Sequence, residues 1–164
     1  MANSTKVQLL DVNTANQVAA GEVVEKPASV VKELVENALD AGADKIDVTI
    51  FAGGTEYIRV ADNGSGMSEA DAKLAVLRHA TSKIRTAGDL MLLHTLGFRG
   101  EALPSIASVS NFNLITRPQD NEFATSIRID GGEQTECLQT GGNAGTTVIV
   151  ENLFYNVPAR RKFL

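Results

Sequence analysis

Residues 27–42 read PASVVKELVENALDAG, and they predict a helix around which the rest of the chain is organised. Proline suits the first turn of a helix, where its missing N–H would have no partner in any case, and Gly42 suits a left-handed stop. Apolar residues recur with the helical period, which predicts one inward-facing stripe. The stripe consists of Val31, Leu34, Val35 and Ala38.

A second stripe of the same predicted helix is polar. Glu33, Glu36, Asn37 and Asp40 stand at i, i+3, i+4 and i+7, so they share a face that we place roughly opposite the apolar one. An ordinary solvated helix face would have the same pattern. The segments that follow in the chain decide between the two interpretations.

Alternating apolar and polar residues predict two half-buried strands after the helix. The first covers residues 46–50, and the second includes Ile58 and Val60, with a turn at Gly53-Gly54 between them. The second strand runs into residues 62–66, which read DNGSG. Glycines after a strand let the backbone approach a flat ligand, and the carboxylate of Asp62 can accept a hydrogen bond from an exocyclic amine. A common Asp-Asn-Gly turn is the alternative.

The remaining segments complete the expected fold class. Ser68 and Asp71 resemble a capping box that opens a helix to about His79, and a loop with helical pieces follows over residues 84–101. A short helix is expected near residues 102–107. Further strands are predicted at residues 111–116, 123–129, 134–138 and 146–150. This order predicts an α+β fold, a two-layer sandwich of helices on a mostly antiparallel mixed sheet.

Composition limits the function classes. The 164 residues suffice for one domain, and their 43% hydrophobic and 21% charged fractions are typical of a folded protein. No apolar run is long enough to span a bilayer, and Cys137 alone cannot form an internal disulfide, so we expect a cytoplasmic protein. The net charge of −5 argues against strong nucleic-acid binding. Residues 160–162 form a basic tail, either solvated or a local DNA contact.

The segment 97–103 reads GFRGEAL, and glycines that lead into a helix can offer backbone N–H groups to phosphate oxygens. A plain surface loop would also fit. A Walker-type phosphate loop is excluded because its glycine-lysine motif is missing. His79 and His94 have no partner at metal-ligand spacing.

Several blocks together resemble the MutL family of DNA mismatch repair proteins, within the GHKL group of ATPases. The blocks are NQVAAGEVV (16–24), KELVENALDAG (32–42), DNGSGM (62–67), RHATSKI (78–84), GFRGEAL (97–103), GTT (145–147) and LFYNVPARRKF (153–163). The resemblance covers most of the chain and implies the Bergerat ATP-binding fold. A gyrase-type topoisomerase is an alternative, but the blocks at 97–103 and 153–163 favour MutL.

The resemblance also implies roles for individual residues. Glu33 would be the general base that activates water, with Glu36 as its rival, and Asn37 would be the ligand of Mg²⁺. Asp62 would recognise adenine. The other residues that would bind ATP are Asp40, Ala41, Gly66, Met67 and Thr146, with a phosphate-contacting set of Thr81, Ser82, Lys83, Gly97, Phe98, Arg99, Gly100, Glu101, Ala102 and Leu103.

At the level of the whole chain, the resemblance implies one ATPase domain over residues 1–164. It would have an N-terminal arm at about 1–26 and an ATP lid at about 80–103. A second domain, which carries a lysine to the terminal phosphate, is expected to be missing, so hydrolysis should be weak. The implied partners are a second copy of the chain, mismatch-recognition and downstream repair proteins, and DNA, weakly. A nucleotide-gated interaction module is the alternative function.

Overall fold

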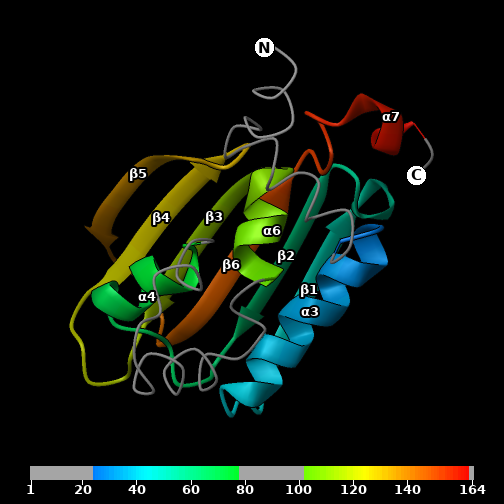
Figure 1. Ribbon diagram of the computed structural model, residues 1–164. Coiled ribbons are helices and arrows are strands. Elements are labelled where there is room, and N and C mark those ends of the chain that lie inside the picture. The colour runs from blue at the N-terminus through cyan, green and yellow to red at the C-terminus, as the bar shows by residue number, and fades with distance from the viewer. Residues whose placement is uncertain (1–23, 78–101, 163–164) are drawn as a thin grey trace, which may run out of the picture.

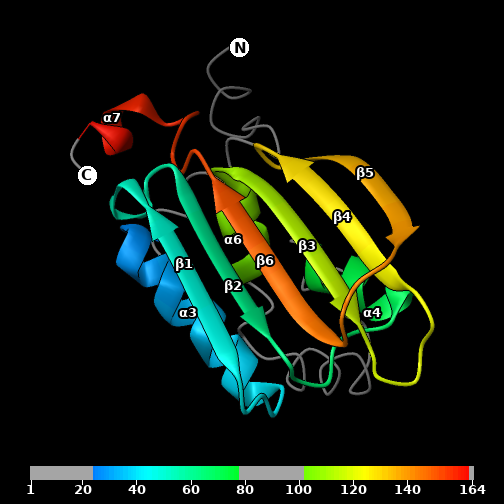
Figure 2. The ribbon, with the colours of Figure 1, turned by 180° about the vertical axis from the view of Figure 1, so that it is seen from behind.

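The structure, a computed structural model, describes residues 24–77 and 102–162. Helices α3, α4 and α6 lie on one face of a single sheet, and the other face is open in this part of the chain (Figures 1 and 2). The helices are α3 (Pro27–Asp40), α4 (Glu69–Ala75), α6 (Ala102–Ser108) and α7 (Pro158–Arg161), with a 3₁₀ turn η1 (Ala52–Gly54). The strands are β1 (Ile46–Phe51), β2 (Tyr57–Asp62), β3 (Asn111–Arg117), β4 (Ala124–Asp130), β5 (Glu133–Thr140) and β6 (Gly145–Glu151).

The sheet has the order β1-β2-β6-β3-β4-β5, so the last strand of the chain lies in its middle. All the described pairings are antiparallel. The predicted α+β sandwich on an antiparallel sheet is therefore confirmed. The strands of the described part include no parallel pair.

Helix α3 begins and ends as predicted. Pro27 occupies its first turn, and Gly42 follows its C-cap with φ 79°. The inward face is rotated from the predicted one, since its buried residues are Val30, Leu34 and Ala38. Val31 and Val35 are only partly buried and flank this face. The 3.6-residue period of the sequence predicts that α3 has an apolar face. Which residues of that face become buried depends on the elements that pack against the helix.

Helix α4 has the predicted Ser68 N-cap without the reciprocal side-chain bond of a full capping box, and it ends earlier than predicted. The Asp71 N–H donates to Ser68 Oγ at 3.2 Å, which confirms the N-cap. The helix ends at Ala75, with Val76 as its C-cap, instead of at about His79. The Leu77 N–H donates to the Leu74 carbonyl at 3.1 Å, so the last turn tightens to an i→i+3 bond.

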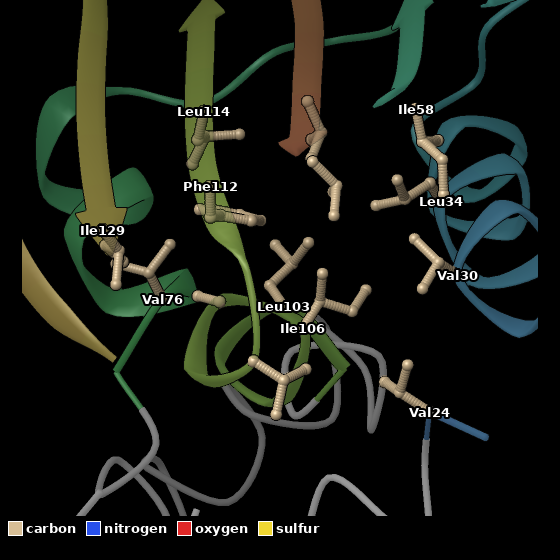
Figure 3. Packing of buried hydrophobic residues seen from close by; sticks show 14 of the residues in the cluster. Val24, Val30, Leu34, Ile58, Val76, Leu103, Ile106, Phe112, Leu114 and Ile129 are labelled. Carbon is tan, nitrogen blue, oxygen red and sulfur yellow. The ribbon is translucent and has the colours of Figure 1, made fainter. Parts of the chain in front are cut away.

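The core fills the space between the helices and the sheet, and it fixes where α3 stands relative to α6. Val30 and Leu34 of α3 lie near Leu103 and Ile106 of α6, and Phe112 of β3 packs in the same cluster (Figure 3). Burying each such side chain stabilises the fold by about 1.5–3 kcal/mol. Within the described ranges no helix has the length and apolar character needed to cross a membrane.

Candidate functional site

A cavity of about 370 Å³ opens where α3, α4 and α6 meet strands β2 and β6. This volume lies in the usual range for small-molecule sites. Its apolar lining residues are Leu34, Val60, Met67, Ala75, Leu103 and Val148. The others are Asn37, Asp40, Ala41, Asp62, Ser65, Gly66, Asp71 and Thr146. An apolar slot edged by carboxylates, an amide and hydroxyls suits a flat ring with polar substituents.

Asp62 forms the polar corner of this cavity at the end of β2. Its Oδ1 accepts a hydrogen bond from the Gly64 N–H at 2.8 Å, and the carboxylate also accepts one from the backbone N–H of Thr146, its partner on β6. Burial raises the pKa of the Asp62 carboxyl, and these two hydrogen bonds partly offset that rise. The corner therefore holds a half-buried acceptor in a fixed orientation.

Gly66 is required by packing, a reason that the sequence did not reveal. Its φ is 68°, and a Cβ at this position would overlap the carbonyl of Arg117 and lie 2.9 Å from the nitrogen of Pro118. The sequence suggested that glycine here makes room for a ligand, and Gly66 does line the cavity. The structure adds that glycine lets the loop after β2 pass against the end of β3.

Thr116 is a buried residue behind the cavity lining, and the sequence did not reveal its role. Its Oγ1 accepts a hydrogen bond from the Met67 N–H at 2.9 Å and lies 2.8 Å from Thr146 Oγ1. The same hydroxyl donates to the Gly145 carbonyl at 3.2 Å. Thr116 thereby joins the loop after β2 to the start of β6. A single threonine within a strand gives no sequence signal for such a role.

Helix α3 forms one wall of the cavity with Leu34, Asn37, Asp40 and Ala41. The polar stripe is therefore adjacent to the apolar face and not opposite it, since Leu34 and Asn37 line the same cavity. Glu33 lies outside the described lining and is half-buried. It precedes Asn37 by four residues on the same helix face, about 6 Å along the axis. Ala41 lies at the other end, where its carbonyl accepts the Ser65 N–H at 2.9 Å.

A family model described as "Histidine kinase-, DNA gyrase B-, and HSP90-like ATPase" matches residues 24–140, which includes α3, the loop after β2 and most of the sheet. The chain belongs to this ATPase family. The match covers both the Asp62 corner and the α3 wall. The matched range includes the segments that carry Asn37, Asp62 and the glycines after β2.

Curated relatives place this ATPase more closely. DNA mismatch repair protein MutL of Heliobacterium modesticaldum is 62% identical over 96% of this chain, and that of Symbiobacterium thermophilum is 61% identical over 97%. The chain spans about a quarter of the length of these relatives, 24% and 25%.

Solved structures agree with that placement. A structure described as "Aquifex aeolicus MutL ATPase domain complexed with ADP" has 38% identity and a TM-score of 0.70, and it matches over 87% of this chain and 48% of its own. The "N terminal domain of a DNA repair protein" has 35% identity and a TM-score of 0.78, over 94% and 45%. The chain is thus similar, in sequence and in fold, to the ATPase domains of MutL proteins.

Part of the predicted site of this ATPase falls outside the described residues. Those positions are Thr81, Ser82, Lys83, Gly97, Phe98, Arg99, Gly100 and Glu101, together with the N-terminal arm before Val24. The last two members of the predicted phosphate-contacting set are described. Leu103 lines the cavity, whereas Ala102 is buried in α6 and is not part of the described lining.

Asn37 on the cavity wall could supply one protein ligand to a magnesium ion that a nucleotide carries. Among residues 24–77 and 102–162 no group of three His, Cys, Asp or Glu side chains could hold a metal. Mg²⁺ commonly takes one or two protein oxygens and fills its octahedral shell with phosphate oxygens and water. The amide oxygen of Asn37 on the cavity wall can supply such a ligand.

Proposed function

We propose that the cavity binds Mg-ATP, with adenine at the Asp62 corner and the phosphates along α3, and that the domain hydrolyses ATP slowly. The observation that carries the proposal is the cavity itself. It brings the carboxylate at the end of β2 and the amide of Asn37 to one apolar slot. Asp62 can accept the adenine amine, and the apolar side chains can cover the ring.

The order of residues along α3 supports the direction of the nucleotide. Ala41 contacts the loop beside Asp62, Asn37 comes one turn earlier, and Glu33 one further turn earlier. Ala41 would then lie near the base of ATP, Asn37 near the metal-bound phosphates, and Glu33 near the terminal phosphate. Bound magnesium would neutralise charge on the phosphates, and we assign Glu33 to accept the proton of the attacking water.

The adenine assignment is tested by Asp62→Asn. The amide presents an N–H₂ group where the carboxylate offered only acceptors, so ATP affinity should fall about tenfold or more. Discrimination against GTP should fall as well. Calorimetric titration with both nucleotides measures the two effects, and an unchanged ATP affinity would reject Asp62 as the adenine contact.

At larger scale we propose the role of a MutL-type protein in mismatch repair, in the cytoplasm. In this proposal ATP orders a lid that includes Thr81, Ser82, Lys83 and residues 97–103, and it brings together the N-terminal arms of two copies. Mismatch-recognition and downstream repair proteins are the proposed partners, and DNA is bound weakly. Family resemblance and the relatives' names support this part of the proposal.

A nucleotide-gated interaction module is a second candidate. The observation in its favour is that Glu33 lies outside the described cavity lining, so ATP could bind without a base at its terminal phosphate. A stoichiometric binding titration beside a phosphate-release assay separates the two functions. Full binding with no release above the uncatalysed rate would favour the module.

A further inference from the structure

The described lining of the cavity is acidic. It contains the carboxylates of Asp40, Asp62 and Asp71, and it contains no Lys, Arg or His within residues 24–77 and 102–162. Because the triphosphate of ATP is strongly negative, carboxylates near it would weaken binding. The nucleoside end is neutral and donates hydrogen bonds through its amine and its ribose hydroxyls. The carboxylates thus favour the nucleoside end.

Asp71 differs from the other two carboxylates of this lining, because both of those already have partners within the protein. Asp62 accepts the N–H groups of Gly64 and Thr146, and Asp40 has an interaction partner of its own. The backbone N–H of Asp71 donates to Ser68, which fixes the start of α4. Its carboxylate has no hydrogen bond or ion pair to the residues that the structure describes.

The position of Asp71 in the fold places it at the mouth of the cavity. Asp71 and Ala75 are one turn apart on α4 and both line the cavity, Ala75 buried and Asp71 exposed. In both ribbon views α3 and α4 lie on either side of α6 (Figures 1 and 2). Asp71 therefore contributes to the wall that faces the α3 wall with Asn37.

We propose that Asp71 accepts a hydrogen bond from a ribose hydroxyl of bound ATP, so that the domain discriminates ribonucleotides from deoxyribonucleotides. The proposal rests on the proposed function. With the amine on Asp62 and the phosphates along α3, the ribose hydroxyls are the remaining donors of the nucleotide. A carboxylate opposite the α3 wall meets these donors without approaching the phosphates.

The test is a calorimetric titration of the protein with ATP, 2′-deoxyATP and 3′-deoxyATP. The wild-type protein should bind at least one deoxynucleotide about tenfold more weakly than ATP, because a hydrogen bond to a charged acceptor is lost. Asp71→Ala should bind ATP about tenfold more weakly and should bind that deoxynucleotide as the wild type does. The preference for ribose would then disappear. Asp71→Asn keeps the shape of the side chain, and its preference should fall in the same direction.

Glu69→Ala is the matched control. It removes the same charge from the same helix. The Glu69 carboxylate lies 2.9 Å from the ammonium of Lys73, and Glu69 is not among the described lining residues of the cavity. This variant should keep the ribose preference of the wild type. The role of Asp71 would be overturned if both Asp71 variants kept the full preference for ATP over the deoxynucleotide. It would also be overturned if Glu69→Ala lost this preference to the same extent as the Asp71 variants. A wild-type protein that binds ATP but shows no ribose preference would also overturn it, whereas one that binds no nucleotide would overturn the proposed function.

Discussion

Single residues of this cavity owe their roles to their surroundings. Asp62 and Asp71 are the same residue type, yet one is half-buried and bonded to two backbone N–H groups while the other is exposed at the mouth. Glu33 and Glu36 lie on one helix, and Glu36 has an interaction partner already. Burial and existing partners therefore distinguish carboxylates of equal charge from one another, and the proposed roles follow these distinctions.

Glu33→Ala tests the assignment of the general base. We expect phosphate release by the complete protein to fall about 10²- to 10⁴-fold, which is the usual contribution of a positioned base. The affinity for ATP should stay within about twofold, because Glu33 lies outside the described lining. Glu36→Ala is the control and should retain most of the turnover. The reverse result, with Glu36 essential and Glu33 dispensable, would exchange the two assignments.

At the scale of elements, local patterns predicted much of the fold. The period of 3.6 residues marked α3, and alternation marked the strands, because both depend on neighbours in the chain. Features that depend on distant contacts were missed or misplaced. Val30, and not the predicted Val31, lies on the buried face of α3. Thr116 joins the loop after β2 to the start of β6, two segments that are far apart in the sequence. The close packing of Gly66 against the end of β3 was missed for the same reason.

Gly66→Ala tests the packing of the loop after β2. The added Cβ would meet both an unfavourable φ of 68° and the backbone of β3 at Arg117. Gly53→Ala is the matched control, since Gly53 has φ 63° and nothing within 4 Å of the new Cβ. Urea unfolding should show a loss of about 1–2 kcal/mol for Gly53→Ala, from the backbone conformation alone. Gly66→Ala should lower the free energy of unfolding by clearly more than Gly53→Ala and should bind ATP less tightly. Equal losses of stability in the two variants would show that the loop after β2 accommodates the added Cβ without a further energetic penalty.

At the scale of the whole molecule, the two ends of the described chain meet. Arg160 of the basic tail donates from Nη1 to the carbonyls of Val24 and Glu25, both at 3.3 Å, and its guanidinium lies 5.4 Å from the centre of the Phe154 ring. The tail was expected to be solvated or to touch DNA. Arg160 instead ties α7 to the segment before α3.

Arg160→Ala should therefore lower the free energy of unfolding by about 1–3 kcal/mol, through the lost cation–π contact and charged hydrogen bonds. Arg161→Ala removes the same charge from the adjacent position and should change stability by no more than about 0.5 kcal/mol. Urea denaturation of both variants measures the difference. Equal effects would mean that the tail acts through net charge and not through this contact.

The central place of β6 has a consequence for how the protein is made. Among the described strands, β6 is the one that pairs with both β2 and β3. The β1–β2 hairpin and the β3–β4–β5 meander can therefore join into one sheet only after residues 145–151 have left the ribosome. Pairing over such long separations is a slow step of folding. Asp62 meets Thr146 only when that strand inserts. We therefore expect a nucleotide to stabilise the finished sheet, in which Asp62 and Thr146 line one cavity.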